Sequence, residues 1–252
     1  MGKWLLVIFA PLIFLGCSSS SRPDPQNVVQ PKVLVFSKTA GYRHASIPDG
    51  IAAVQRLGAA NQFAVDASED ASLFNDATLA GYKAVIFLCT TGDVLDLNQM
   101  SSFQRYIEAG GGFVGIHSAS DTEHHWPWYG HLVEAYFRSH PAIQPASVSI
   151  EDFTNPSTAF LPANWQRTDE WYNFATNPRG SVHVLATVDE NTYSGGTMGS
   201  DHPIAWCHLY DGGRAWYTAG GHTIQSYSEP LFQRHILGGI EYAAAMKAAN
   251  CQ

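Results

Sequence analysis

Residues 110–121 read GGGFVGIHSASD, an apolar segment that runs into a tight turn of small residues. This pattern is typical of a strand-turn-helix elbow, which lifts one side chain above the carboxyl ends of the strands in an α/β sheet. The small neighbours leave room for a strained backbone and for an approaching ligand. The residue at this elbow is His117, and not Cys or Ser. The stretch therefore predicts an α/β fold with a ligand site beside His117.

Alternating strand and helix patterns flank the elbow. Short apolar runs separated by amphipathic segments show the βαβ rhythm of a parallel sheet. The third quarter of the chain is less regular, and its strands are expected to form an antiparallel edge. The turn Asp211-Gly212-Gly213 predicts a hairpin. The expected strands are residues 33–37, 63–66, 84–89, 113–116, 148–151, 170–174, 182–188, 204–210 and 214–218, and the expected helices are residues 48–60, 98–109 and 231–246.

The first 16 residues are predicted to be a signal peptide, because Lys3 precedes an apolar run that is shorter than the roughly 20 residues of a spanning helix. The following Cys17 and its serines resemble the lipobox of bacterial lipoproteins, although Phe14 leaves plain secretory cleavage open. Residues 17–31 are rich in Ser, Pro and Asn and predict a flexible tether. The protein is therefore expected to be exported and held in the cell envelope by a lipid on Cys17, at the outer membrane if the organism has one.

Residues 32–248 show no second shift in composition and no internal repeat, so they predict a single domain. Removal of Lys3 with the signal leaves 13 basic and 22 acidic residues. This balance argues against a nucleic-acid partner. No nucleotide cofactor is expected, and the composition does not indicate an oligomeric state.

Three cysteines follow Cys17, namely Cys89, Cys207 and Cys251. An exported location would permit a disulfide, and the pairing of Cys207 with Cys251 is the one worth considering. Buried thiols are the favoured interpretation. The chain has no CxxC motif, so a cysteine-based metal site is not expected.

Two polar segments lie where strands should end. Residues 38–44, KTAGYRH, follow the first strand and place an aromatic ring, a guanidinium and an imidazole at the carboxyl edge of the sheet. They favour ligand binding, with a surface ion pair of Arg43 as the alternative. In the second segment, DEWYN at 169–173, Asp169 and Glu170 face opposite sides of a strand, so at most one points into a given cleft. A carboxylate beside aromatic rings suits a sugar, and an inward-packed Trp171 is the alternative.

Histidines mark a third group of segments. His202 lies in DHPIAW at 201–206, and His222 follows a strand and a Gly pair, which indicates close backbone approach at a strand end. If His117, His202 and His222 converge, they would bind a divalent metal or act as general acid and base. The remaining histidines are interpreted as surface or loop residues. The segment around His124 and His125 forms either a lid or a helix that starts at Pro127, and the helix is favoured.

Five motifs together resemble the ThuA-like (trehalose utilisation) family, and they cover nearly all of residues 32–246. They are KTAGYRH at 38–44, GIHSA at 115–119, DEWY at 169–172, DHPIAW at 201–206, and GRAWYT at 213–218 with the following Gly221-His222. The resemblance implies a flavodoxin-like three-layer sandwich related to class I glutamine amidotransferases, with a mainly parallel central sheet and an antiparallel C-terminal extension. It also implies a role in carbohydrate metabolism. In those amidotransferases a nucleophilic Cys occupies the elbow, so His117 argues against glutamine hydrolysis here.

The family is associated with pathways that oxidise disaccharides at the 3-hydroxyl, which implies a 3-keto-glycoside or disaccharide as substrate. A ketone acidifies the neighbouring C–H, and its proton can be removed by a base aided by an electrophile on the carbonyl oxygen, leading to elimination, hydrolysis or isomerisation. The hypothesis assigns proton transfer or ligation of a divalent metal such as zinc to His117, His222, Glu170 and His202, with His117, His202 and His222 as the metal ligands. It assigns substrate binding to Tyr42, Arg43, His44, Asp121, Trp171 and Tyr172. The alternatives are a non-catalytic sugar-binding lipoprotein and a metal-dependent hydrolase of another exported substrate.

Overall fold

The structure is a computed structural model that describes residues 1–4 and 30–251. Cys17 and nearly all of the predicted signal peptide (1–16) and linker (17–31) lie outside the described residues, so these predictions are not tested by the structure. Within the described part of the chain, no helix combines the length and the apolar character that crossing a bilayer requires.

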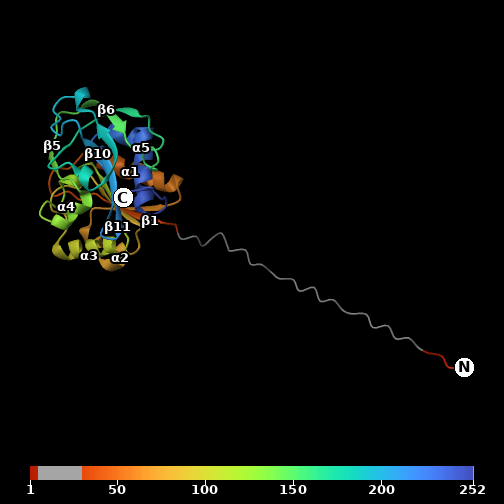
Figure 1. Cartoon of the computed structure of the whole chain (residues 1–252). Helices are drawn as coiled ribbons and strands as arrows, with labels where there is room; N and C mark the ends of the chain where they lie inside the picture. The colour runs from red at the N-terminus through yellow and green to blue at the C-terminus, as the bar shows by residue number, and fades with distance from the viewer. Residues whose placement is uncertain (5–29, 252) are drawn as a thin grey trace.

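A nine-stranded sheet in the order β2-β1-β3-β4-β11-β10-β9-β6-β7 forms the centre of the domain (Figure 1). Five strands run parallel, and they are β1 (Lys32–Phe36), β2 (Ala64–Ser68), β3 (Ala84–Leu88), β4 (Gly112–Ile116) and β11 (Gly213–Thr218). The antiparallel half comprises β6 (Gln144–Ile150), β7 (Asn164–Asp169), β9 (His183–Val188) and β10 (Pro203–Tyr210). The short strands β5 (Phe137–Ser139) and β8 (Asn173–Phe174) pair separately.

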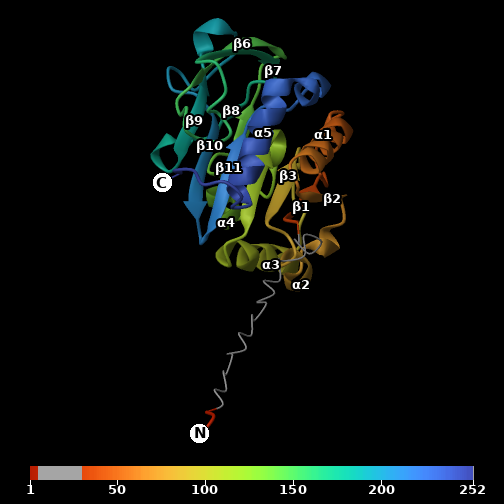
Figure 2. The ribbon, with the colours of Figure 1, turned by 90° about the vertical axis from the view of Figure 1, so that its right-hand side faces the viewer.

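Helices cover both faces of the parallel half, as Figure 2 shows from the side. Adjacent residues of a strand point to opposite faces, and in β3 the Leu88 side chain faces Gly50 of α1, whereas the Phe87 ring packs 5.3 Å from that of Phe103 in α3. Both faces are thus buried, which explains why every residue of β3 and β4 is buried. The helices are α1 (Ile47–Ala60), α2 (Asp76–Leu79), α3 (Leu97–Glu108), α4 (Pro127–Val133) and α5 (Pro230–Ala243).

The predicted α/β fold is confirmed, but the prediction of a mainly parallel sheet is wrong. Among the described residues, four of the eight strand pairings in the nine-stranded sheet are antiparallel, and so is the separate pairing of β5 with β8. The reason lies in the hairpin at Asp211-Gly212, where both residues have positive φ, because this turn reverses the chain between β10 and β11. The strands beyond β10 continue antiparallel. They come from the middle of the chain as well as from near its end, so the antiparallel part is not a C-terminal extension.

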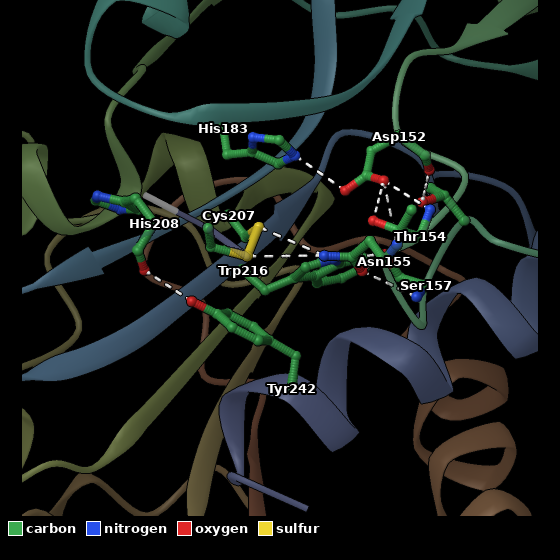
Figure 3. The surroundings of a disulfide bond; sticks show 11 residues. Asp152, Thr154, Asn155, Ser157, His183, Cys207, His208, Trp216 and Tyr242 are labelled. Carbon is green, nitrogen blue, oxygen red and sulfur yellow. Dashed lines mark hydrogen bonds and ion pairs between the residues drawn. A yellow bond between two sulfur atoms is a disulfide. The ribbon is translucent and has the colours of Figure 1, made fainter. Parts of the chain in front are cut away.

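A disulfide joins Cys207 of β10 to Cys251, with 5.4 Å between the Cα atoms. Figure 3 shows Asn155 beside it, and the Asn155 amide nitrogen lies 3.6 Å from the Cys207 sulfur. The favoured interpretation of buried thiols is therefore wrong for these two cysteines. Cys89 is the free cysteine of the described residues, and it is buried. The bond ties the end of the chain to the antiparallel half.

Candidate functional site

The elbow at the end of β4 presents His117 as the sequence predicts. His117 adopts a left-handed backbone with φ of 54° and begins a 3₁₀ turn, His117–Asp121. The preceding glycine is required by packing, because a Cβ atom at Gly115 would lie 2.8 Å from the Tyr217 ring. The left-handed backbone of His117 is strained because His117 is not a glycine, and strained residues of this kind are typical of functional sites.

Three further side chains converge on His117. His44 follows β1, His222 follows β11, and Glu170 follows β7. Gly221 has φ of 114°, and a Cβ atom there would lie 2.7 Å from the Tyr227 hydroxyl, so only glycine allows this loop to turn toward the cluster. The three histidines thus come from the carboxyl ends of parallel strands, whereas the carboxylate comes from the antiparallel half.

We call His44, His117, Glu170 and His222 the strand-end cluster. One nitrogen or oxygen atom from each lies within 4.8 Å of the others. His117 Nε2 is 3.1 Å from His222 Nδ1 and 3.5 Å from Glu170 Oε2. Glu170 Oε2 is also 3.1 Å from His222 Nδ1. Three of the four side chains are buried and that of His222 is partly buried, so the ligand atoms are largely shielded from solvent.

Hydrogen bonds define the tautomer of His117. Its Nδ1 lies 2.8 Å from the carbonyl oxygen of Ala219. Because a carbonyl can only accept, Nδ1 carries the proton and Nε2 keeps a lone pair directed at the cluster. A backbone carbonyl on the far nitrogen is the arrangement that metal-binding histidines commonly show.

The charges of the cluster follow from burial and from mutual contacts. Burial, together with the neighbouring His117 and His222, lowers the pKa of His44 to about 3, so this ring is neutral near pH 7. Burial opposes ionisation of Glu170, but its close contacts with His117 and His222 hold its pKa well below the ordinary value. Burial likewise opposes protonation of His222, yet the Glu170 carboxylate raises the pKa of this histidine. The cluster therefore combines an ionised carboxylate with imidazoles of different proton affinity.

Asp169 holds the backbone that carries His222 and Glu170 of the cluster. Its carboxylate accepts hydrogen bonds from the backbone N–H groups of Gly221 at 2.9 Å and His222 at 3.1 Å, and also from the N–H of Glu170. Buried Arg167 donates to the same carboxylate at 3.1 Å, and its guanidinium lies between two aromatic rings, those of Trp165 and Phe232. Of the two carboxylates, Glu170 lines the pocket and Asp169 holds the backbone of the His222 loop, so one of them points into the cleft, as predicted.

A pocket of about 290 Å³ opens over the cluster. Within it, the Tyr172 hydroxyl lies 2.9 Å from His117 Nε2. His140 Nδ1 lies 2.9 Å from Glu170 Oε1 and 2.9 Å from the carbonyl oxygen of Pro141, so this nitrogen is also protonated and the His140 Nε2 lone pair is free. The lining residues are Tyr42, His44, Asp121, Phe137, His140, Glu170, Tyr172 and His222.

The structure corrects three of the predicted site residues. His202 does not join the cluster, because its Nε2 bonds the carbonyl oxygen of Tyr172 at 2.7 Å and its Nδ1 faces Glu190 at 2.9 Å. Trp171 is fully buried and packs inward, which is the alternative named above. Arg43 lies at the surface and pairs with Glu69 at 2.6 Å. Neither of these last two lines the pocket.

The sequence interpretation missed Phe137 and His140. Both belong to the short β5 region, which pairs with β8 and so lies beside Tyr172. The sequence places His140 among the surface or loop histidines, because nothing local marks it as a site residue. The pairing of β5 with β8 brings it to the pocket. His124 lies outside the pocket lining and pairs with Asp121 at 2.9 Å. The expected helix beginning at Pro127 is confirmed as α4.

The free thiol near the cluster does not replace the missing elbow nucleophile. Cys89 is buried at the end of β3, and burial raises the pKa of its thiol to about 12. A thiol with so high a pKa carries almost no thiolate near neutral pH.

Comparison with known proteins agrees with this architecture. A ThuA-like protein from Bacteroides uniformis ATCC 8492 has 23% identity, covering 87% of this chain and 95% of that one, with a TM-score of 0.72. A ThuA-like protein from Parabacteroides merdae ATCC 43184 has 19% identity, covering 88% and 92%, with a TM-score of 0.70. At such identities the likeness shows a shared fold. No curated protein sequence shows significant similarity to the chain.

The profile of one family, described as trehalose utilisation, matches residues 32–243, which span the sheet, the elbow and all four residues of the strand-end cluster. The protein therefore belongs to the ThuA family.

Proposed function

We propose that the protein is a carbohydrate-active enzyme that binds a divalent cation in the strand-end cluster and removes a proton next to the ketone of a 3-keto-glycoside. The single observation that carries the proposal is the convergence of three imidazoles and one carboxylate beneath a pocket. Membership of a family described as trehalose utilisation supports a carbohydrate-related role. The strand-end cluster thus supports the chemistry of the proposal, and the family supports the choice of a carbohydrate as substrate.

The cluster fits a cation such as Zn²⁺. Nitrogen and carboxylate oxygen are ligands that zinc accepts at about 2.0–2.2 Å. The ligand atoms lie within 4.8 Å of one another, which small side-chain movements can close. His117 offers a lone pair on Nε2 because its other nitrogen is held by Ala219. A bound cation would supply an electrophile for a carbonyl oxygen.

His140 is the proposed general base. Its Nδ1 proton is directed at Glu170 and Pro141, so the Nε2 lone pair is the atom available to take a proton from the substrate. A carboxylate behind the ring orients the imidazole and stabilises the positive charge that forms on protonation. Tyr42 and Asp121, at the mouth of the pocket, are proposed to bind sugar hydroxyl groups.

The fold of the parallel half supports the placement of this site. We propose that β2-β1-β3-β4-β11 is a flavodoxin-like unit, because its order corresponds to the 2-1-3-4-5 order of that fold. In such sheets ligands bind beyond the carboxyl ends of the strands. The strand-end cluster lies at that edge.

Export with a lipid on Cys17 belongs to the same proposal, with the lipid as the contact to the membrane. The disulfide between Cys207 and Cys251 supports it, since such bonds persist mainly outside the reducing cytosol. Labelling of cells with a radioactive fatty acid tests it. The parent protein should take up label and sediment with membranes, and Cys17→Ser should do neither.

Elemental analysis and turnover test the activity. Full-length protein purified without chelator should hold about one cation per chain and release p-nitrophenolate from a p-nitrophenyl 3-keto-glucoside, while His117→Ala should lose both. His208→Gln is the matched control, because His208 is buried but bonds the carbonyl oxygen of Leu132 away from the pocket. Equal turnover by folded His117→Ala would refute the proposal. Tight binding of an unoxidised disaccharide without turnover of the keto-glucoside would instead identify a sugar-binding protein.

A further inference from the structure

The lone pair on His117 Nε2 can either accept a hydrogen bond from the Tyr172 hydroxyl or bind a cation in the strand-end cluster. In the neutral imidazole that a cation requires, His117 Nε2 is unprotonated because Nδ1 donates to Ala219. The Tyr172 hydroxyl, 2.9 Å away, must therefore be the donor in its hydrogen bond with Nε2. The same nitrogen is the atom that His117 offers to a cation shared with His44, Glu170 and His222. A cation on this nitrogen consumes the lone pair, so the Tyr172 hydroxyl loses its acceptor.

The Tyr172 ring is held in place while its hydroxyl can turn. The ring centroid lies 4.2 Å from that of His117 and 4.3 Å from that of Phe137. The side chain is buried, yet it lines the pocket. Within the described residues, this hydroxyl makes its hydrogen bond to His117 Nε2. Rotation about the C–O bond redirects the proton into the pocket without moving the ring.

We propose that Tyr172 is a catalytic residue whose hydroxyl passes from His117 Nε2 to the carbonyl oxygen of the substrate when the cation occupies the cluster. The inference rests on the proposed function. It adds the Tyr172 hydroxyl to the cation as a second group that draws electrons from the carbonyl oxygen of the substrate. As the base takes the proton from the carbon beside the ketone, the C–H electron pair forms a C=C bond and the C=O π pair moves onto oxygen. Tyr172 donates a hydrogen bond to that oxygen. The carbonyl then re-forms, and the electron pair of this C=C bond moves to make a new C=C bond with the anomeric carbon. The bond from the anomeric carbon to the glycosidic oxygen breaks at the same time, and the alcohol leaves with a proton from the protonated base.

The arrangement couples cation binding to substrate activation. Without the cation, the hydroxyl is bound to His117 and does not point at the substrate. With it, the hydroxyl turns into the pocket, and because the packed ring holds its oxygen in place, it can donate where negative charge develops in the transition state. Tyr172 thus touches the reacting atoms and is not only a support for the histidine.

Tyr172→Phe keeps the ring and removes the donor. We expect calorimetric affinity for Zn²⁺ to be equal to or tighter than that of the full-length parent, because no hydroxyl competes for His117 Nε2. We expect kcat on p-nitrophenyl 3-keto-glucoside to fall by about 100-fold to 1,000-fold, the usual cost of one lost oxyanion donor, with KM nearly unchanged. Tyr193→Phe is the matched control, since its hydroxyl lies 3.1 Å from His202 Nδ1 away from the pocket.

A spectroscopic readout does not depend on turnover. Zn²⁺ added to the parent should give a near-ultraviolet tyrosine difference spectrum as the hydroxyl leaves its acceptor, and Tyr172→Phe should lack it. An unchanged kcat in Tyr172→Phe would overturn the inference. So would a Zn²⁺ affinity that falls more than about tenfold, which is the range expected for a residue that only orients a ligand. A parent that binds no Zn²⁺ and turns over no keto-glucoside would refute the proposed function itself, and this is seen before any variant is compared.

Discussion

Buried histidines occupy two regions of this protein, and they differ in what their ring nitrogens meet. In the interior, His235 bonds the carbonyl oxygen of Ser157 at 2.9 Å and the Thr218 hydroxyl at 3.2 Å, and His208 bonds the carbonyl oxygen of Leu132. In the strand-end cluster, one nitrogen of His117 is held by a carbonyl in the same way, but the other faces His222 and Glu170. Burial is common to both regions.

The surroundings of the second ring nitrogen therefore distinguish a histidine that can bind a ligand from one with a purely structural role. A ring whose nitrogens both meet hydrogen-bonding groups is satisfied and adds only to stability. A ring whose second nitrogen also lies among other imidazole nitrogens and a carboxylate can, in addition, share a proton or a cation with them. His202 is buried and bonds the backbone of Tyr172, and its Nδ1 meets the Tyr193 hydroxyl and Glu190. Among the described residues it joins no group of three possible ligands, so it belongs with the interior histidines.

The largest expected effect comes from removing the carboxylate of the cluster. Glu170→Gln should weaken Zn²⁺ binding by more than about 100-fold, the upper end of the range for groups outside the ligand set, because an anionic ligand is lost. The matched control is Glu190→Gln, which alters the carboxylate beside His202. Calorimetry on both full-length variants checks the prediction. Equal losses of Zn²⁺ affinity would show that the strand-end cluster and the surroundings of His202 do not differ in metal binding.

Acid should destabilise the protein through the interior histidines. Burial lowers the pKa of His235 to about 4, whereas the unfolded chain has the ordinary value of 6.5. Between these values the unfolded state binds more protons, so the free energy of unfolding should fall by roughly 3 kcal/mol at most as pH is lowered from 6.5 to 4. Urea unfolding at several pH values measures this slope. His235→Gln should flatten it, and an unaltered slope would contradict the assignment.

Asp169→Asn probes the support that joins the two halves of the sheet. An amide presents only one acceptor oxygen, so its NH₂ group would face an N–H donor of Gly221 or of His222. We expect Zn²⁺ affinity to fall by about 10-fold to 100-fold, as for other partners behind metal ligands. Asp201→Asn, at the surface beside Arg179, serves as the control. An affinity equal to that of the control would show that the His222 loop holds its position without Asp169.

The smallest effect on binding is expected from His202→Gln. Its ring contacts the Tyr172 carbonyl and not the cluster, so Zn²⁺ affinity should change by less than about tenfold. The free energy of unfolding should fall by about 1–3 kcal/mol, because a buried carbonyl loses its donor. Calorimetry and urea unfolding of the same sample separate the two quantities. A large loss of Zn²⁺ affinity would show that His202 contributes to the metal site.

The positions of His44, His117 and His222 could be predicted because each follows a strand of the parallel half, and parallel strands end at one edge. The orientation of side chains in the antiparallel half was harder to predict. His202 precedes β10 at this same edge, since Ala205 pairs with Thr218, but its ring turns to the backbone of Tyr172. His140 reaches the pocket through a three-residue strand, β5, which carries too few residues for a period to be read.

The direction of β1 also sets which way the pocket faces. The chain enters the sheet at Lys32, the amino end of β1, whereas the pocket lies beyond the carboxyl ends of the parallel strands. If Cys17 carries a lipid, the 15 residues 17–31 span at most about 50 Å. A domain tethered in this way joins its anchor on the side away from the pocket. The opening can then point away from the bilayer, toward the surrounding solution.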